Sequence, residues 1–214
     1  MLYIVSTPIG NLEDITLRAI RTLKEVDFIL AEDTRRTRIL LNKYTISKPL
    51  QSYHDRNKEH KTPAIIALLR QGKNIALVSD AGTPAISDPG FYLVRECIRN
   101  QITVSPIPGP SSILAALVCS GLPTDRFTFC GFMPKKPAKI LRQIKDQEST
   151  FIFFESPHRI EKTLAALAQD MPDHQVVVAR EITKRFEEFI RGNPKEILPK
   201  IKPKGEIVLL IRKT

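Results

Sequence analysis

Residues 75–90 read Ile-Ala-Leu-Val-Ser-Asp-Ala-Gly-Thr-Pro-Ala-Ile-Ser-Asp-Pro-Gly and pass from a continuous apolar run into a loop of small and turn-forming residues. The first four residues predict a buried strand, and Asp88 with Pro89 predicts the N-cap and first position of a helix. The apolar face of this helix is expected to carry Phe91, Val94 and Ile98. A strand, a small-residue loop and a helix in this order are typical of the carboxyl edge of an α/β sheet, where ligands usually bind.

The loop itself has the residues that a ligand site needs. Gly82 and Ala85 leave room for a ligand, and Asp80 supplies one fixed acceptor. A tight turn between a strand and a helix, with no ligand, explains this segment equally well. The rest of the chain must therefore decide between the two interpretations.

The same order of strand and helix recurs along the first half of the chain. Strands are expected at residues 2–5, 28–31, 50–53, 75–78 and 102–105. Helices are expected over 14–25, 34–43, 62–71, from 89 onward, and over 113–118. Thr62 and Pro63 predict the N-cap and first position of the third helix. These five alternations predict a mainly parallel sheet.

The pattern changes after residues 121–125, the best candidate for a linker. Strands are expected at 127–132, 151–155, 175–180, 186–191 and 207–212, and helices over 137–146 and from Ser156, as N-cap, to about 170. With fewer helices among these strands, the second half predicts an α+β domain with a mixed or antiparallel sheet. We therefore expect an α/β protein with two domains, an α/β domain over 1–121 and an α+β domain over 122–214.

The charge of the chain points to an anionic partner. Its 33 lysines and arginines exceed its 23 acidic residues and give a formal net charge of +10. Such an excess attracts polyanions, but it does not separate RNA from a small polycarboxylate substrate. The three cysteines lack the spacing of metal or redox sites, and no apolar run is long enough to span a bilayer. Because no basic leader precedes the first acidic residues, a cytoplasmic location is expected.

Several common catalytic motifs are absent. None of the nine glycines falls in a G-x-G-x-x-G pattern, and G-x-x-x-x-G-K-[ST], G-x-S-x-G and H-E-x-x-H are missing too. The four histidines do not have the spacing of metal ligands on one helix, and no metal site is predicted. What remains is a set of loops at predicted strand ends, at 7–11, 32–36, 79–84, 108–112, 155–159 and 180–183. Loops at the ends of parallel strands can converge although they lie far apart in the sequence.

Short motifs occupy these loops and their neighbours. In chain order they are Thr-Pro-Ile-Gly-Asn-Leu-Glu-Asp-Ile-Thr (7–16), Ala-Glu-Asp-Thr-Arg (31–35), Ser-Tyr-His-Asp-Arg-Asn (52–57), Val-Ser-Asp-Ala-Gly-Thr-Pro-Ala-Ile-Ser-Asp-Pro-Gly (78–90), Pro-Gly-Pro-Ser-Ser (108–112), Gly-Phe-Met-Pro-Lys-Lys (131–136), Phe-Glu-Ser-Pro-His-Arg (154–159), Ala-Arg-Glu-Ile-Thr-Lys (179–184) and Lys-Gly-Glu (204–206). Together they resemble the tetrapyrrole methylase superfamily, in particular its methyltransferases of small-subunit ribosomal RNA. The resemblance extends essentially from end to end, and the motif set is highly specific.

The resemblance implies a fold, a cofactor and a reaction. It implies two α/β domains with S-adenosylmethionine in the cleft between them, and a homodimer. The reaction would be methyl transfer to the ribose 2′-hydroxyl of a cytidine in the decoding region of 16S ribosomal RNA, in the RNA itself or in the small ribosomal subunit. Carried over by motif, the cofactor-binding residues would be Pro8, Asp80, Gly82, Thr83, Ser111, Ser112, Phe154 and Ala179.

Each group of these residues would contact a different region of the cofactor. Asp80 and its two neighbours in the motif would line the amino acid and ribose side. Ser111 and Ser112 would supply hydroxyl and backbone contacts at a helix N-terminus. The adenine and sulfonium regions would be bordered by Pro8, Phe154 and Ala179.

Methyl transfer to a ribose hydroxyl requires alignment of the reacting atoms and a base. A sulfonium makes its methyl group electrophilic, so the protein must mainly align the attacking oxygen with the leaving sulfur. A base assists proton loss from the 2′-hydroxyl, which is otherwise a poor nucleophile. Glu155 and Glu181 are the first candidates for that base, followed by Glu32 and Asp33, and then by His54. For each single carboxylate, an interdomain salt bridge or a cap is the competing explanation.

Cations are expected to contact the RNA. Arg35, Arg159, Arg180 and Lys184 would hold phosphates or orient the ribose. The basic helix over 135–145 and the lysines at 200, 202 and 204 would follow the RNA backbone, although simple solvation also explains them. The sequence has no aromatic RNA-recognition signature. Selection of the target is therefore expected to depend on RNA shape and on a splayed-out nucleotide.

Two other functions stay open. A methyltransferase for a carboxylated tetrapyrrole would also suit a positively charged cleft, but its first loop is typically rich in glycine. Here that loop reads Thr-Pro-Ile-Gly-Asn-Leu, which favours the RNA enzyme. The second alternative is a non-catalytic RNA-binding or assembly protein that keeps the fold.

Overall fold

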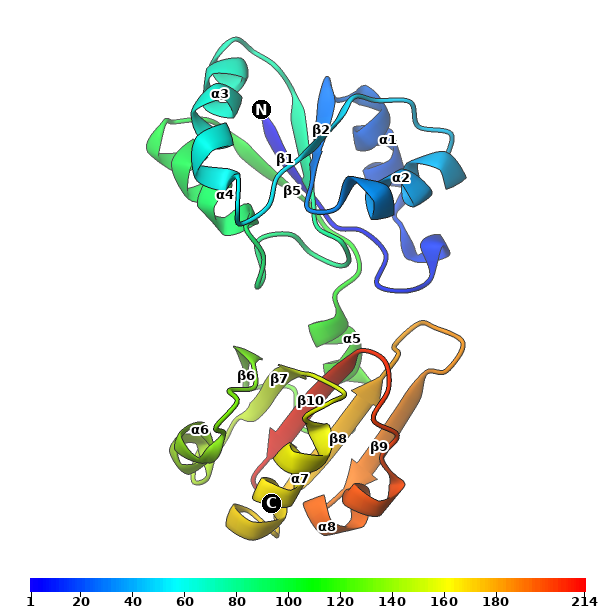
Figure 1. Ribbon diagram of the computed structural model, residues 1–214, viewed down its shortest axis with the longest axis vertical. Helices are drawn as coiled ribbons and strands as arrows, with labels where there is room; N and C mark the ends of the chain where they lie inside the picture. Colours follow the sequence, from blue (N-terminus) through cyan, green and yellow to red (C-terminus); the bar gives the residue numbers. More distant parts are fainter. The chain divides into compact units, whose positions relative to one another are not determined.

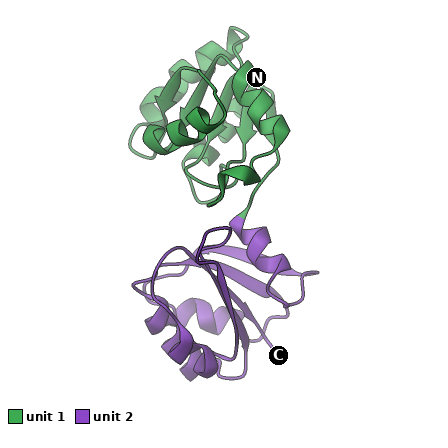
Figure 2. Ribbon diagram, turned by 90° about the vertical axis from the view of Figure 1, so that its right-hand side faces the viewer, with its two compact units in different colours: residues 1–111 green, residues 112–214 purple.

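The computed structural model describes residues 1–214. The chain divides into two compact units, unit 1 (Met1–Ser111) and unit 2 (Ser112–Thr214), which Figure 2 shows in separate colours. The sequence pattern predicts this boundary later, after Gly121. The difference arises because helix α5 (Ser112–Val118) packs on strand β10 (Ile207–Arg212) of unit 2. Arg191 also donates hydrogen bonds to the carbonyls of Cys119 and Ser120, just after α5. The Thr150 hydroxyl donates to the Pro123 carbonyl, which fixes the predicted linker to unit 2.

Unit 1 is built on a parallel sheet of five strands in the order β3-β2-β4-β1-β5. The strands are β1 (Leu2–Val5), β2 (Phe28–Ala31), β3 (Leu50–Ser52), β4 (Ile75–Val78) and β5 (Val104–Ile107). Its helices are α1 (Leu17–Glu25), α2 (Thr34–Lys43), α3 (Lys58–Arg70) and α4 (Gly90–Arg99), with a 3-10 turn η1 (Leu12–Asp14). Helices α1 and α2 cover one face of the sheet, and α3 and α4 cover the other (Figure 1). The predicted parallel sheet is confirmed, and its central strands are apolar throughout because both faces are covered.

Unit 2 is built on a mixed sheet in the order β6-β7-β10-β8-β9. Its remaining strands are β6 (Phe127–Phe132), β7 (Thr150–Glu155), β8 (Gln175–Arg180) and β9 (Glu188–Gly192). Its remaining helices are α6 (Ala138–Ile144), α7 (Ile160–Asp170), α8 (Pro194–Ile197) and the 3-10 turn η2 (Leu198–Lys200). Strand β6 pairs with β7 in parallel and all other pairs are antiparallel, which confirms the prediction of a mixed sheet. None of the helices in either unit has both the length and the apolar character that a membrane crossing needs.

Helix α1 begins at Leu17, after the 3-10 turn η1, and not at residue 14. Helices α3 and α7 also begin at other residues than predicted. Helix α3 begins at Lys58 and not after Thr62, because the Thr62 hydroxyl donates to the Lys58 carbonyl (2.6 Å) inside the first turns. Pro63 therefore lies within this helix. Helix α7 begins at Ile160, after a turn in which the Ser156 carbonyl accepts hydrogen bonds from the amides of Arg159 and Ile160. Both differences concern turns that continue directly into a helix.

The apolar face predicted for helix α4 is wrong for Phe91 and Ile98, although Val94 does pack against the core. Phe91 and Ile98 are 61% and 65% exposed, whereas Leu93 and Cys97 are completely buried. The cause is the start of the helix, where a Cβ on Gly90 would lie 2.9 Å from the Leu77 side chain. This close approach to β4 turns the stripe of Leu93 and Cys97 toward the sheet.

Asp88 does cap helix α4, although Pro89 and not Asp88 is the residue that directly precedes the first helical residue, Gly90. Asp88 accepts hydrogen bonds from the backbone amides of Gly90 (2.7 Å) and Ala85 (2.9 Å). The carboxylate therefore closes the loop onto the first turn of the helix, which begins at Gly90.

Candidate functional site

The loops after β1, β4 and β5 are tied together at the carboxyl edge of the unit 1 sheet. Thr7 and Gly82 exchange two backbone hydrogen bonds of 2.9 Å each. The Ser6 hydroxyl donates to Thr83 Oγ1 (3.1 Å), and the Thr83 hydroxyl donates to the Pro110 carbonyl (3.2 Å). Three loops that are distant in the sequence thus form one continuous surface, which we call the unit 1 edge (residues 6–8, 79–83 and 108–111).

Two glycines allow these loops to approach one another. Gly82 has φ of +77°, and a Cβ there would lie 3.3 Å from the Ile9 side chain. A Cβ on Gly109 would lie 3.0 Å from Cβ of Ser6. Only glycine adopts the first conformation without strain, so the small residues of the predicted site also serve its internal packing.

Asp80 is held by two partners from the segment after β2. Its Oδ1 accepts a hydrogen bond from the Asp33 amide (2.9 Å), and its Oδ2 lies 3.5 Å from Nη1 of Arg36. Asp80 and Pro8 also line a hollow of about 60 Å³. A space of this size holds water-sized groups and not a nucleoside. The carboxylate is therefore fixed at the unit 1 edge.

The neighbouring carboxylates of the β2–α2 loop differ in basicity. Asp33 accepts hydrogen bonds from the guanidinium (2.7 Å) and the amide (2.9 Å) of Arg35, which hold its pKa far below the usual range. Burial raises the pKa of Glu32, and the negative charges of Asp80 and Asp88 raise it further. Asp33 is thus a permanently ionised cap of α2, while Glu32 is the more basic group.

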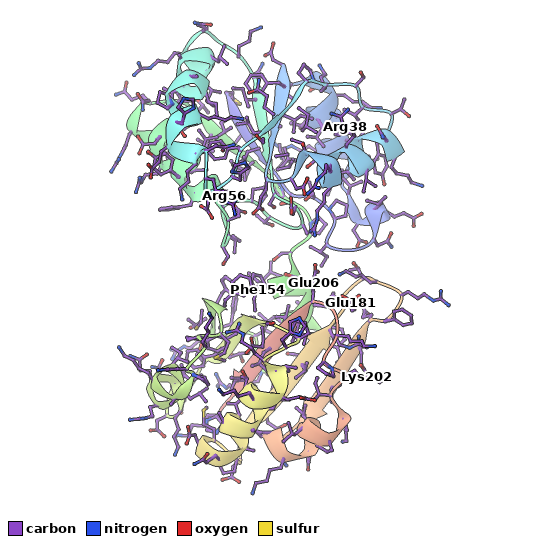
Figure 3. The ribbon with its side chains drawn as sticks, in the orientation of Figure 1. Arg38, Arg56, Phe154, Glu181, Lys202 and Glu206 are labelled. Atoms are coloured by element: carbon purple, nitrogen blue, oxygen red, sulfur yellow. The ribbon has the colours of Figure 1, made fainter.

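The unit 2 residues predicted for the site also meet at one sheet edge. Ile207, at the start of β10, lies opposite both Glu155 at the end of β7 and Arg180 at the end of β8. Phe154, Glu181 and Glu206 are seen at this end of the sheet in Figure 3. We call this the unit 2 edge (residues 132–133, 154–155, 179–184 and 204–207).

Glu155 is completely buried and fully paired. Its Oε1 accepts from the Ser156 amide (2.6 Å) and lies 2.8 Å from Nη2 of Arg159, and its Oε2 accepts from the Thr163 hydroxyl (2.5 Å). Arg159 in turn donates to the Met133 carbonyl (2.9 Å). These contacts favour a structural ion pair over a proton acceptor, because no oxygen of this carboxylate faces solvent.

Glu181 is held in an unusual backbone conformation. Its φ is +51°, and its Oε1 accepts hydrogen bonds from the Glu206 amide (2.9 Å) and the Lys184 ammonium (3.0 Å). The hydrogen bond from the Glu206 amide, and then the one from Lys184, lower the pKa of Glu181 below its ordinary value. This carboxylate joins two loops of the unit 2 edge and is a weak base.

Gly205 is expected to be essential for this arrangement. Its φ is +80°, and a Cβ there would lie 2.5 Å from the Glu181 carboxyl group. Gly205→Ala should lower the free energy of unfolding by about 2–3 kcal/mol, from backbone strain and from displacement of that carboxylate. Gly121→Ala is the matched control, because Gly121 has φ of +79° with nothing within 4 Å and should lose only about 1 kcal/mol. If urea unfolding gave the same loss of free energy of unfolding for both variants, the contact with Glu181 would contribute nothing.

The other predicted residues have mixed surroundings. Ala179 is buried in β8, Ser111 ends unit 1, and Ser112 begins α5. Arg180 pairs with Glu188 (2.9 Å) across β8 and β9. His54 Nε2 lies 3.1 Å from the side-chain nitrogen Nδ2 of Asn57, within its own loop.

Two of the residues that connect the loops, Ser6 and Arg36, are not among the predicted site residues. Ser6 and Thr7 join β1 to the loop after β4, and Arg36 pairs with Asp80. Thr7 opens the predicted loop at 7–11, and Ser6 immediately precedes it, so the position of Ser6 directly after a strand is a usable signal. Nothing in the sequence pairs Arg36 with Asp80.

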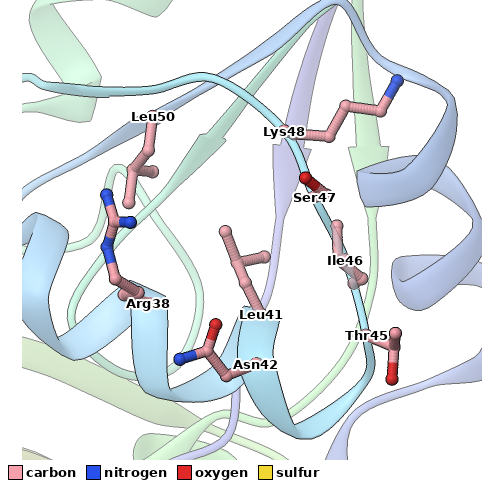
Figure 4. A pocket seen from close by; sticks show the side chains of 8 residues that line it. All are labelled: Arg38, Leu41, Asn42, Thr45, Ile46, Ser47, Lys48 and Leu50. Atoms are coloured by element: carbon pink, nitrogen blue, oxygen red, sulfur yellow. The ribbon is translucent and has the colours of Figure 1, made fainter.

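A separate hollow lies at the far end of helix α2. It has a volume of about 390 Å³ and is lined by Arg38, Leu41, Asn42, Thr45, Ile46, Ser47, Lys48 and Leu50. Figure 4 shows Arg38 and Lys48 on opposite sides of Leu41. Because Leu50 begins β3, this hollow lies at the opposite end of that strand from the unit 1 edge.

Comparison with known proteins identifies a family. The model of the Tetrapyrrole (Corrin/Porphyrin) Methylases matches residues 1–198. "Ribosomal RNA small subunit methyltransferase I" of Thermotoga maritima is 50% identical over 98% of this chain and 97% of its own length. The protein of the same name from Halalkalibacterium halodurans is 49% identical over 98% of this chain and 75% of its own length.

Solved structures share the fold at low sequence identity. A diphthine synthase matches with a TM-score of 0.78 and 16% identity, over 100% of this chain and 90% of that one. Uroporphyrin-III C-methyl transferase from Thermus thermophilus, complexed with S-adenyl homocysteine, matches with a TM-score of 0.68 and 17% identity, over 99% and 97%. The chain therefore belongs to the tetrapyrrole methylase family, in which relatives at about half identity are the proteins named ribosomal RNA small subunit methyltransferase I.

Proposed function

We propose that this chain is an S-adenosylmethionine-dependent methyltransferase of small-subunit ribosomal RNA. The observation that carries the proposal is the 50% identity to the Thermotoga maritima protein over 98% of this chain. We further propose, from the motif resemblance, that the acceptor is the ribose 2′-hydroxyl of a cytidine in the decoding region of 16S RNA. The homodimer and the cytoplasmic location implied by the same resemblance stay predictions.

The unit 1 edge has the chemistry that one part of S-adenosylmethionine requires. That cofactor carries a sulfonium and an ammonium group, and the fixed carboxylate of Asp80 is a suitable partner for a cation. Gly82 and Thr83 bring small side chains and backbone close to the same position. As the motif resemblance implies, we propose that Ser111 and Ser112 also contact the cofactor, and that Pro8, Phe154 and Ala179 border its adenine and sulfonium regions.

The residues of the chain must align the ribose and accept its proton. The bound cofactor supplies an electrophilic methyl group, so alignment provides most of the rate. We assign proton acceptance to Glu32, which directly follows β2 and precedes Asp33, the residue whose amide donates to Asp80. The carboxylates of Asp33 and Glu181 are already bound by Arg35 and Lys184, whereas burial raises the pKa of Glu32.

The first candidates for the base are reassigned from their contacts. Glu155 becomes the residue that positions Arg159, and Glu181 the residue that joins the loops of the unit 2 edge. Arg35, whose side chain is 89% exposed, is proposed to contact an RNA phosphate.

A transfer assay with three acceptors tests this function. The full chain is incubated with methyl-labelled S-adenosylmethionine and with unmodified small subunits, their naked RNA, or a carboxylated tetrapyrrole. Label is expected in the RNA of the first or second reaction and not in the third. Label on the tetrapyrrole would contradict the proposal, and so would RNA binding without any transfer. Heat-denatured chain gives the background of each reaction.

A further inference from the structure

Strand β6 contains a bulge that brings Phe132 opposite Phe154. Phe129 pairs with Ile152 in regular register, but the next pair joins Phe132 to Phe154, so β6 contains one extra residue. Gly131, within this irregularity, has φ of +73°. A bulge of this kind changes the direction of the following side chain. Without the bulge, Gly131 would lie opposite Phe154. With it, Phe132 takes that position.

The bulge creates a small aromatic cluster. The Phe154 ring centroid lies 4.9 Å from that of Phe129 and 5.3 Å from that of Phe132, at interplanar angles of 64° and 62°. Such edge-to-face contacts hold aromatic rings in a defined orientation. Phe132 nevertheless remains 62% exposed. The cluster thus presents one ordered aromatic ring to solvent.

The backbone next to Phe132 is held from two sides. The Met133 amide donates to the Phe154 carbonyl (2.9 Å), and the Met133 carbonyl accepts from Arg159 (2.9 Å). Arg159 is itself fixed by the buried carboxylate of Glu155. Because hydrogen bonds already hold the backbone beside this ring, little conformational entropy is lost when a ligand stacks on it.

Unpaired cations follow this ring in the sequence. Lys135 and Lys136 precede helix α6, and Lys139 lies in its first turn. All three are exposed, and none of them forms an ion pair with a carboxylate. An exposed aromatic ring that is followed within seven residues by three unpaired lysines matches a ligand that has both a flat apolar face and repeated negative charge. Single-stranded nucleic acid has both properties.

We propose that Phe132 and these three lysines bind a single-stranded RNA segment, with one unpaired base stacked on Phe132 and the flanking phosphates on the lysines. The choice of RNA rests on the proposed function. Duplex RNA hides the faces of its bases, so it would gain only from the lysines. The sequence showed no aromatic recognition signature, because the bulge that exposes Phe132 is visible only in the folded strand.

Binding of a short, unstructured, fluorescent oligoribonucleotide to the full chain tests this proposal. Phe132→Ala should weaken binding about tenfold or more, whereas Phe132→Trp should keep it. Phe127→Ala is the matched control, because Phe127 lies on the same strand, is 43% exposed and has no aromatic partner. It should bind as the unsubstituted chain does. Affinity for an RNA duplex should be the same for all four proteins.

The salt dependence separates the ring from the lysines. Lys135→Ala with Lys136→Ala should flatten the dependence of log Kd on log salt concentration, and Phe132→Ala should leave that slope unchanged. Unchanged oligonucleotide affinity of a folded Phe132→Ala variant would overturn the proposal, as would equal losses in Phe132→Ala and Phe127→Ala. Thermal unfolding of each variant establishes that it is folded.

The transfer assay keeps the two proposals distinguishable. If the unsubstituted chain methylates small subunits while Phe132→Ala binds the oligonucleotide normally, only the stacking proposal fails. If no methyl group is transferred to RNA but oligonucleotide binding depends on Phe132, the proposed function fails and the stacking site stands.

Discussion

Glu155→Ala is expected to lower the free energy of unfolding by about 3–5 kcal/mol. The substitution leaves the guanidinium of Arg159, the amide of Ser156 and the hydroxyl of Thr163 without their shared acceptor. Arg159 is 29% exposed, so solvent compensates part of the loss and the lower end of the range is expected. Glu155→Gln keeps the shape and some hydrogen bonds and should lose about half as much. Urea unfolding followed by circular dichroism measures both.

An exposed ion pair provides the control for the buried one. Asp55 pairs with Lys58 at 2.8 Å but is 74% exposed, so Asp55→Ala should lose less than about 1 kcal/mol. Equal losses for Glu155→Ala and Asp55→Ala would contradict the buried pair. A Glu155→Gln protein with full stability but no methyl transfer would instead restore Glu155 as the base.

Asp80→Ala is expected to weaken S-adenosylmethionine binding about a hundredfold. The substitution removes a negative charge proposed to face the cationic cofactor, and it breaks the hydrogen bond that fixes the Asp33 amide. Asp80→Asn can still accept that hydrogen bond but lacks the charge, so it should lose only about tenfold. Isothermal titration calorimetry with the full chain measures both affinities.

Asp27→Asn is the matched control for Asp80. Asp27 also accepts a backbone hydrogen bond between loops, from the Asn74 amide (2.8 Å), but at the opposite edge of the same sheet. Its substitution should leave cofactor affinity unchanged. Unchanged affinity of Asp80→Ala, or equal losses in Asp27→Asn, would remove Asp80 from the cofactor site.

The strands were predictable from sequence because their apolar runs end at turn residues. Strands β2, β4, β6, β8 and β10 have the predicted bounds, and their alternation with helices was enough for the sheet types. Which of two apolar stripes of a helix is buried was not predictable. In α4 both Phe91 with Ile98 and Leu93 with Cys97 have helical spacing, and the contact of Gly90 with Leu77 decides between them.

Helix α8 shows a signal that was present but unused. Asn193 and Glu196 form a capping box around Pro194, and the Asn-Pro-Lys-Glu sequence is the signature of such a start. The lysine and proline content of the segment concealed it. Short helices of this kind depend on the cap more than on an apolar pattern.

The candidate site was predictable in position but not in its pairings. Loops at the ends of parallel strands were expected to converge, and Thr7 does meet Gly82. Periodicity carries no information on which carboxylate is buried, however, so Glu155 resembled Glu32 in the sequence. Their surroundings differ because Glu155 faces Arg159 and Thr163, whereas Glu32 lies near three other carboxylates.

The position of the transferred methyl group on the RNA decides whether the proposed reaction is right. Unmodified small subunits are incubated with the chain and methyl-labelled S-adenosylmethionine, and their RNA is then digested completely to nucleosides and separated. We predict that the label elutes as 2′-O-methylcytidine, and that its linkage resists alkaline hydrolysis of the undigested RNA, because the 2′-oxygen can no longer attack the phosphate. Label on a base, on another nucleoside, or absent from the RNA would contradict the proposed reaction.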